Sequence, residues 1–226
     1  MAVDQQRRSL IAAAAAGAGG LLLSNRALAQ TPPACTVTPQ QTEGPYFVDA
    51  KLQRSDIRAE SGGNAAPRPG VPLAMALRLV SVAGSNCTPL AGAVVDVWHC
   101  DAAGVYSGVA GNNGNFLRGH QLSDAEGRVR FMTIYPGWYP GRAVHVHFKV
   151  RGKSAVGRGY EFTSQLYFDE QANDRVFAMT PYARSGGRVR NEQDGGFRSG
   201  GGRLMVKLSP DGSGYAGSFD IGVRGV

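Results

Sequence analysis

The sequence from residue 71 onward consists of short apolar or alternating segments, each bounded by Gly, Pro, Asp or Asn. The segments are Val71–Val82, Ala93–Cys100, Gly127–Ile134, Ala143–Arg151, Phe162–Phe168, Arg203–Leu208 and Tyr215–Val223. Strands separated by turn residues at this spacing are typical of antiparallel β-sandwiches. One helix is predicted over Asp169–Met179, where Asp169 can cap the first turn. We therefore predict a mainly β fold, an antiparallel β-sandwich with long loops and one short helix.

Two further regions differ in composition from the strand-rich part. Residues 30–70 are rich in Pro, Gly, Gln and charge, and we interpret them as an extended N-terminal arm before a β-sandwich domain over residues 71–226. The stretch 184–202 is rich in Gly and Arg and is predicted to be a surface loop. Removal of a predicted N-terminal signal from the 226-residue chain leaves about 200 residues, enough for one well-buried domain and too few for two.

Residues 1–29 have the composition of an export signal. Adjacent arginines, Arg7 and Arg8, precede an Ala/Gly/Leu run, and an A-x-A cleavage motif follows at Ala27–Ala29. The run is short for a membrane span of ~20 residues. Paired arginines indicate the twin-arginine route. We therefore expect a periplasmic or secreted protein, exported by that route and with no membrane association once the signal is removed.

The three cysteines all lie beyond the predicted signal. An oxidising compartment favours one disulfide and one remaining thiol. Cys35 falls in the arm and Cys87 in a turn, so a bridge between them would staple the arm to the body. Cys100 ends an apolar strand and is predicted to be a buried thiol.

The chain is basic. Its net charge is +7, and loss of a signal that holds three arginines and one aspartate lowers it to +5. The arginines are scattered, which favours a solvated basic surface over a nucleic-acid site. We expect no nucleic-acid partner.

The run Val144–Val150 alternates apolar and polar residues around His145 and His147. Side chains along a strand alternate between faces, so both imidazoles are predicted to project from the same face. Tyr106 follows a strand and a turn, and Tyr139 lies in a loop six residues before His145. Taken alone, such a His pair is most often a surface or core feature, and a lone Tyr is most often half-buried. The conjunction of four potential ligands favours a metal site.

The ligand types then indicate the metal. Zinc sites use Cys, His and carboxylate, so tyrosine would be an unusual ligand there. A tyrosinate is a hard anionic donor that favours Fe(III). Two tyrosinates, two neutral imidazoles and one hydroxide would leave Fe(III) formally neutral, which lowers the cost of burying it.

The chain resembles the intradiol ring-cleavage dioxygenases, which include protocatechuate 3,4-dioxygenase and the catechol 1,2-dioxygenases. The resemblance covers about residues 42–168 and depends on Asp96–Tyr106, Asp124–Gly127 leading into Phe131–Ile134, Pro136–His147 and Thr163–Phe168. It implies non-haem Fe(III) with the ligands Tyr106, Tyr139, His145 and His147. It also places Arg142 beside the iron, as a catalytic and substrate-binding residue, and Gln165 near the substrate.

The resemblance implies that a catechol-type ring is opened by O2 between its two hydroxylated carbons, giving a muconate-type diacid. Tyr139 would leave the iron when substrate binds and take up a proton, and Arg142 would stabilise developing negative charge. The space between Tyr139 and Arg142 is shorter than in the protocatechuate enzymes. The expected partners are therefore a small aromatic diol of open identity and O2, and assembly into a homo-oligomer is also left open.

Two alternatives follow from the same residues. Leu90–Val95 and Asp124–Val129 also resemble transthyretin-like β-sandwich modules, which bind ligands without chemistry. That alternative makes the His and Tyr set a coincidence. The second alternative keeps a metal but is a zinc or copper hydrolase that also uses His99 or His120. His99, next to Trp98, is predicted to be a packed or surface residue.

Overall fold

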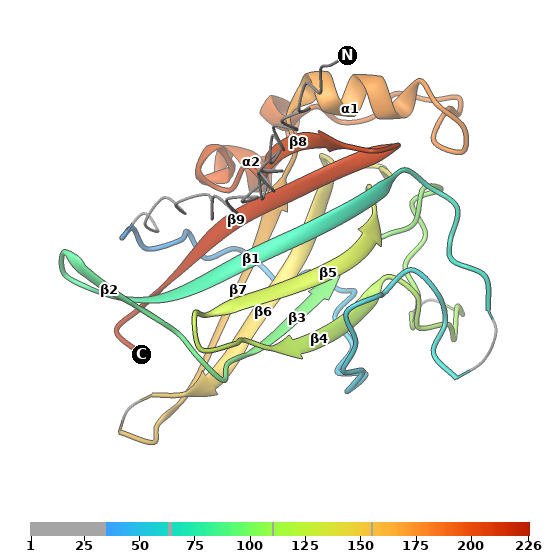
Figure 1. Cartoon of the computed structure of the whole chain (residues 1–226). Coiled ribbons are helices and arrows are strands. Elements are labelled where there is room, and N and C mark those ends of the chain that lie inside the picture. The colour runs from blue at the N-terminus through green and yellow to red at the C-terminus, as the bar shows by residue number, and fades with distance from the viewer. Residues whose placement is uncertain (1–34, 63–64, 110, 155) are drawn as a thin grey trace, which may run out of the picture. The chain divides into compact units, whose positions relative to one another are not determined.

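The computed structural model describes residues 35–62, 65–109, 111–154 and 156–226. The predicted export signal, residues 1–29, lies outside these residues, as does the start of the predicted arm, residues 30–34. The described residues belong to one compact unit, Pro33–Val226. Two β-sheets form the body of this unit (Figure 1), as the strand pattern predicts.

The larger sheet has five strands. They are β1 (Pro72–Ala83), β2 (Asn86–Pro89), β5 (Arg128–Ile134), β8 (Lys207–Asp211) and β9 (Gly214–Arg224). The order is β2-β1-β9-β8, and β5 pairs with β1 along the same edge as β2, opposite β9. All these pairs are antiparallel except β1 with β9, which is parallel and departs from the prediction. A parallel pair needs a long crossover connection, and most of the chain lies between β1 and β9.

The smaller sheet has four antiparallel strands in the order β4-β3-β6-β7. Their bounds are Arg118–Leu122 for β4, Val94–Trp98 for β3, His145–Lys153 for β6 and Gly159–Tyr167 for β7. The sequence prediction missed β4 and also β2. Neither strand has an alternating apolar pattern, because β4 reads RGHQL and β2 reads NCTP.

The hydrophobic core fills the space between the two sheets. Val146, Phe148 and Val150 of β6 contribute to it, and Leu73 and Phe131 contribute from the five-stranded sheet. Each fully buried side chain of this kind contributes about 1.5–3 kcal/mol to stability. The alternate residues of β6, among them the two histidines, lie on the outer face of the four-stranded sheet. The outer face is therefore the place where the strand pattern brings polar side chains together.

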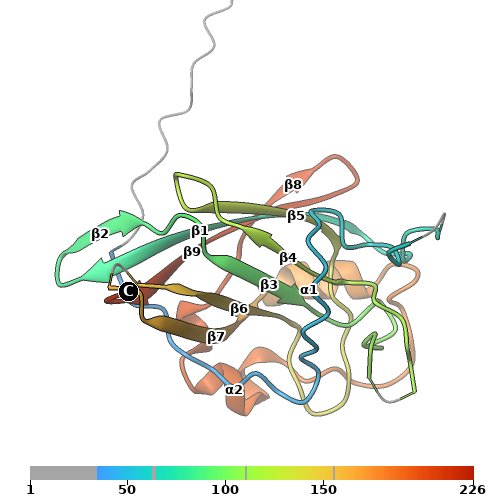
Figure 2. The same cartoon turned by 90° about the horizontal axis from the view of Figure 1, so that it is seen from below.

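The N-terminal arm covers this outer face (Figure 2). In its described residues, between positions 35 and 70, it has no helix and no strand beyond two isolated bridges, to His120 and Met132. The Gln41 backbone N–H donates to the Thr163 carbonyl at the edge of β7 (3.1 Å). The predicted pairing of Cys35 with Cys87 is present as a disulfide, although Cys87 lies in β2 and not in a turn.

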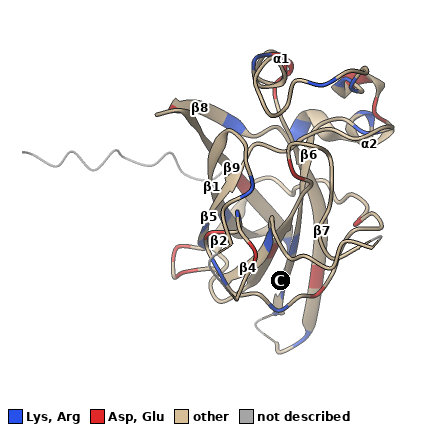
Figure 3. Ribbon diagram, turned by 90° about the vertical axis from the view of Figure 1, so that its right-hand side faces the viewer, with Lys and Arg blue, Asp and Glu red and all other residues tan. Residues whose placement is uncertain are grey.

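The predicted helix is α1 (Glu170–Phe177), and its N-cap is Asp169, which accepts from the N–H groups of Gln171 and Ala172. Ion pairs join this helix to Arg188 and Arg190, and Figure 3 shows both signs of charge there. Among the described residues, no helix has the length and apolarity needed to cross a membrane.

The structure corrects two predictions near the C-terminus. The stretch 184–202 is not simply a surface loop, because it forms α2 (Gly195–Arg198) and 3-10 turns at Asn191–Gln193 and Gly201–Arg203, and it buries Asp194. The strand predicted at Arg203–Leu208 begins only at Lys207. The preceding residues bond instead to Tyr167, which donates its N–H to the Leu204 carbonyl and accepts from the Val206 N–H (both 2.9 Å).

Candidate functional site

His145 and His147 lie side by side on the outer face of β6, as predicted. Their Nε2 atoms are 3.0 Å apart, and the rings are nearly perpendicular. The Nδ1 atom of His145 is 2.7 Å from the Ala143 carbonyl oxygen. A carbonyl can only accept, so Nδ1 carries the proton and Nε2 of His145 presents its lone pair. This arrangement is the one that a metal-binding histidine requires.

Both rings are held in the neutral form. Burial, together with the positive charge of Arg142 nearby, lowers the pKa of His145 to about 3. Burial also lowers the pKa of His147 well below its usual value. Trp98, the register partner of His147 on β3, stacks on its ring at 4.9 Å with an interplanar angle of 6°. Metal binding requires neutral imidazoles, so no proton has to be removed from these rings first.

Tyr106 is positioned by a turn that follows β3. The Oδ1 atom of Asp101 accepts from the N–H groups of Ala103 (2.9 Å) and Val105 (3.0 Å), which closes the turn. The Tyr106 side chain is buried, and its hydroxyl has no hydrogen-bond partner among the described residues. Burial raises the pKa of Tyr106 well above its usual value. A buried phenol oxygen without a partner is costly unless a ligand completes it.

Tyr139 comes from a second loop that packs directly against the turn of Tyr106. Glycines allow this contact: a Cβ on Gly137 would lie 2.2 Å from the Asp101 carbonyl oxygen, and one on Gly104 would lie 2.3 Å from that of Trp138. The Tyr139 hydroxyl is 3.1 Å from Nε2 of His145. Burial raises the pKa of Tyr139 to about 12, against a lowering effect of Arg142. The loop contact thus brings the second tyrosine to the histidines.

The structure therefore brings together the four residues predicted as metal ligands. The two tyrosine rings are 5.6 Å apart, and the Tyr106 ring is 6.4 Å from the His147 ring. Besides the Tyr106 hydroxyl, Nδ1 of His147 is buried and without a partner in the described part of the chain. Two phenols and two neutral imidazoles form a donor set that suits Fe(III). Zinc usually binds Cys, His and carboxylate ligands, and tyrosine is not among them.

Arg142 and Gln165, the predicted substrate residues, contact each other beside the histidines. The Nη2 atom of Arg142 donates to Oε1 of Gln165 (2.5 Å), and Gln165 is the register partner of His147 on β7. Gln165 also donates to the Thr42 carbonyl of the arm (2.9 Å). A pocket of about 440 Å³ adjoins this contact, and its lining includes Thr42, Gln165 and Gly196.

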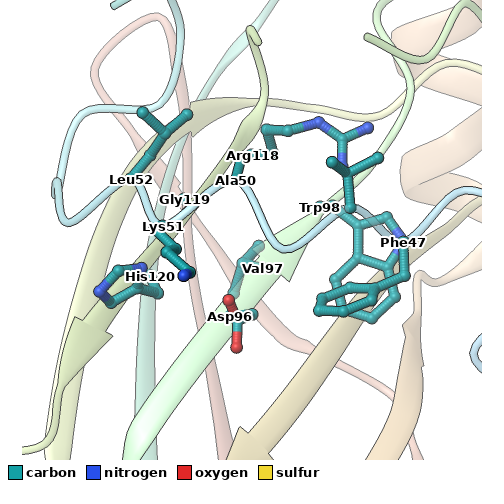
Figure 4. Close-up of a pocket in the computed structure, with 11 residues that line it drawn as sticks. Phe47, Ala50, Lys51, Leu52, Asp96, Val97, Trp98, Arg118, Gly119 and His120 are labelled. Carbon is teal, nitrogen blue, oxygen red and sulfur yellow. The ribbon is translucent and has the colours of Figure 1, made fainter. Parts of the chain in front are cut away.

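Two residues of the arm cover the site. The Tyr46 ring stacks on that of Tyr106 at 4.3 Å, and the Phe47 ring lies 4.9 Å from that of Trp98, which Figure 4 shows. The arm approaches so closely at Gly44 that a Cβ there would lie 3.4 Å from Cε1 of His147. The aromatic pair in the Gly44–Phe47 stretch is the signal in the sequence that marks these residues.

Sequence reasoning missed Asp194, whose Oδ2 accepts from Nε of Arg142 (2.9 Å). It also missed the hydroxyl of Tyr167, which lies 3.3 Å from Oε1 of Gln165. The sequence does point to Tyr167, because it lies two residues after Gln165 and therefore on the same face of that strand. In the structure it is the register partner of His145. No feature of the sequence points to Asp194, since it lies in a glycine-rich stretch far along the chain from its partners.

His99 and His120, the additional ligands of the hydrolase alternative, are not part of this group. His99 is buried, and its Nε2 pairs with Oγ1 of Thr133 (2.7 Å). His120 lies on β4 opposite Asp96 and lines the pocket drawn in Figure 4. Across the described residues, no three His, Cys, Asp or Glu side chains are grouped so that they could hold a metal ion.

Comparisons with known proteins agree with this geometry. A family model described as "Dioxygenase" matches residues 42–194. Protocatechuate 3,4-dioxygenase beta chain of Burkholderia cepacia is 31% identical over 153 residues, which are 61% of this chain and 59% of that protein. Catechol 1,2-dioxygenase 2 of Acinetobacter lwoffii is 36% identical over 152 residues, 58% of this chain and 51% of the relative. The chain thus spans less than two thirds of the length of these curated relatives.

A solved structure covers more of the chain. The intradiol ring-cleavage dioxygenase from Tetranychus urticae superposes with a TM-score of 0.73 and 30% identity, over 84% of this chain and 95% of that one. The family model spans more than half of the 226 residues and includes all four of the grouped His and Tyr residues. From its sequence and its structure, the chain belongs to the intradiol ring-cleavage dioxygenase family.

Proposed function

We propose that this protein is an oxidoreductase that uses non-haem Fe(III) and O2 to cleave a catechol-type ring between its two hydroxylated carbons, with a muconate-type diacid as product. The observation that carries the proposal is the grouping of two phenols and two neutral imidazoles on the outer face of the four-stranded sheet. Family membership supports the reaction class. It also counts against a non-catalytic transthyretin-like module, for which this grouping has no purpose.

Tyr106, Tyr139, His145 and His147 would hold the iron. Ionised phenols and neutral imidazoles would balance the charge of a trivalent ion together with one hydroxide, so the centre could sit in a buried, aromatic environment. When bound, Fe(III) would supply Lewis acidity that withdraws electron density from a catecholate and opens the ring to O2.

The two tyrosines are not equivalent, and the difference suggests separate roles. Tyr106 is 5% exposed and stacks on Tyr46, whereas Tyr139 is only partly buried. Tyr139 is therefore the phenol better placed to move when substrate binds. Its raised pKa of about 12 makes its ionised form a strong base, able to accept a proton from a catechol hydroxyl. Tyr106 would remain in place.

Arg142 and Gln165 would orient the substrate. The guanidinium is partly exposed, stays cationic, and is fixed by Gln165 and Asp194. A fixed cation beside the reacting ring stabilises negative charge that develops on the substrate oxygens. The rings of Tyr46 and Trp98 would exclude water from the same region, which strengthens this electrostatic effect.

We also propose export to the periplasm or the exterior by the twin-arginine route. The disulfide between Cys35 and Cys87 supports an oxidising compartment, because such bonds persist there and are rare in the cytosol. Fractionation of a host that expresses the full chain tests this, and a paired change of Arg7 and Arg8 to Lys should retain the precursor inside the cell.

The test of the reaction is oxygen uptake by the iron-loaded protein with catechol, followed by identification of the product. We expect uptake of O2 in equal molar amount with catechol, and a ring-opened diacid that carries both atoms of labelled O2. Iron-loaded protein that binds catechol without consuming O2, or a product opened beside the two oxygenated carbons, would contradict the proposal.

A further inference from the structure

Asp194 is a buried carboxylate that accepts hydrogen bonds at both oxygens. It is 1% exposed and forms the N-cap of α2. Its Oδ1 accepts from the N–H groups of Gly196 (2.6 Å) and Phe197 (3.2 Å). Its Oδ2 accepts from Nε of Arg142 (2.9 Å) and from the N–H of Ala143 (2.6 Å). Four donors from two segments of the chain therefore converge on one anion, which holds the segments together.

The two contacts of Oδ2 lead to two different parts of the site. Arg142 continues through Nη2 to Oε1 of Gln165 (2.5 Å). Ala143 continues through its carbonyl, which accepts from Nδ1 of His145 (2.7 Å). One oxygen atom thus restrains both the guanidinium and the backbone of Ala143, the residue whose carbonyl sets the tautomer of a histidine ring. Partners of this kind orient a metal-binding histidine.

The segment that carries Asp194 is fitted closely to these partners. A Cβ on Gly196 would lie 2.8 Å from the Tyr167 hydroxyl and 3.0 Å from Nη2 of Arg142, so a larger residue would have to displace the ends of these side chains. The Phe197 ring packs edge-on against that of Tyr167 at 5.3 Å. The backbone around Asp194 is therefore anchored independently of its carboxylate.

We propose that Asp194 is a positioning residue of the active site, which fixes Arg142 and, through the backbone of Ala143, the ring of His145. This role rests on the proposed function, because it concerns the same site. Asp194 itself contacts neither of the histidines nor the tyrosines assigned as ligands. Without it, the guanidinium regains rotamer freedom, and the loss of alignment lowers the rate.

The test compares Asp194→Asn with Glu192→Gln, which removes the same charge from an exposed side chain two residues away. We expect D194N to lower the affinity for iron about 10- to 100-fold in competition with a chelator, and to lower kcat/KM for catechol by a similar factor. In iron-free protein, ¹H–¹⁵N spectra should show the Nδ1–H tautomer of His145 in wild type and a mixture in D194N. E192Q should match wild type in all three measurements.

The Arg142→Ala variant separates the two contacts of Oδ2. We expect R142A to lose turnover while it keeps the iron affinity and the His145 tautomer of wild type. At saturating iron, the R142A/D194N double variant should turn over no more slowly than R142A. Wild-type iron affinity and tautomer in D194N, or rate losses that multiply in the double variant, would overturn the proposal. Wild type that binds iron without turnover would refute the proposed function, and the affinity and tautomer comparison would still decide the role of Asp194.

If D194N does not fold, Gly196→Ala tests the same arrangement with the carboxylate retained. The added methyl group would crowd Arg142 and Tyr167, and we expect a loss of kcat/KM of about tenfold with a normal iron content. Wild-type kinetics in G196A would then contradict the proposal.

Discussion

His99 and the pair His145 and His147 lie on opposite faces of the four-stranded sheet, and all three are 1% exposed. His99 points into the core, where its Nε2 pairs with Thr133 of the opposite sheet (2.7 Å) and its Nδ1 with the Cys100 carbonyl (2.8 Å). On the outer face, the Nε2 atoms of His145 and His147 face each other at 3.0 Å. Both ring nitrogens of His99 are therefore hydrogen-bonded on the inner face, whereas the histidines on the outer face can bind a further partner through Nε2.

Burial alone therefore does not identify a metal-binding histidine. Burial lowers the pKa of His99 to about 4 and that of His145 to about 3, so both rings are neutral. What differs is the set of partners at each nitrogen. His99 has a protein partner at both nitrogens and serves to link the sheets. His145 has a carbonyl at Nδ1, and its Nε2 faces the Tyr139 hydroxyl and Nε2 of His147, both potential metal ligands. This is the pattern of a metal site.

The largest expected effect comes from the outer face. His147→Ala should abolish iron-dependent turnover, because it removes one of four donors from the proposed centre. The free energy of unfolding of the iron-free protein should change far less than the activity, since the ring makes no hydrogen bond to the core. Iron content and oxygen uptake are the measurements. A variant that keeps both iron and turnover would show that His147 is not a metal ligand.

The counterpart on the inner face should lower stability and spare the iron. His99→Ala leaves a cavity and removes the partner of Thr133, so we expect a loss of about 2–4 kcal/mol in the free energy of unfolding. Urea denaturation of iron-free protein measures it. Thr133→Val is the matched control, with an expected loss of about 1–3 kcal/mol. Loss of iron binding in either variant, once folded, would show that His99 belongs to the site.

The stability that His99 provides should depend on pH. The folded pKa of His99, about 4, lies below the unfolded value near 6.5. Between these values the unfolded chain binds the proton and the folded protein does not, so stability is present above pH 6.5 and is lost as the pH falls towards 4. The stability difference between wild type and H99A should therefore shrink over this range, by up to about 3 kcal/mol. A difference that stays constant would show that His99 is not held neutral.

The smallest expected effect concerns charges that hold the arm on the outer face. Glu161 lies 2.9 Å from Nζ of Lys149, and its side chain is 56% exposed. Lys149 also pairs with Glu43 of the arm and lies over the Phe47 ring at 3.9 Å. Glu161→Gln should therefore lower the free energy of unfolding by at most about 1 kcal/mol, with turnover unchanged. A loss above about 2 kcal/mol in urea denaturation would mean that the contact between Glu161 and Lys149 also stabilises the binding of the arm.

The strands with a clear alternating pattern were predictable from sequence. In β6 the alternation around Val146 and Phe148 predicts the strand, and it also predicts that both histidines project from the same face. Strand β4 was not predictable, because its residues are polar and it pairs with β3 only in the folded protein. The parallel pairing of β1 with β9 was likewise missed, since it joins segments distant in sequence.

For the site, the sequence motifs gave the residues but not the contacts that align them. The closeness of Tyr106 and Tyr139 depends on backbone packing at Gly104 and Gly137, which no periodicity reveals. The contact between Arg142 and Asp194 joins residues 52 positions apart. Long-range contacts of this kind depend on the assembled sheets, and so they required the structure.

The visible absorption spectrum of the iron-loaded protein shows directly whether Tyr106 and Tyr139 bind the iron. Two tyrosinates bound to Fe(III) should give an intense visible band, and the band should shift when catechol is added. Tyr106→Phe, which removes one phenol oxygen and keeps the ring stacked on Tyr46, should abolish or strongly weaken it. A wild-type protein that takes up stoichiometric iron and remains colourless would contradict the account, because the tyrosines would then not be ligands.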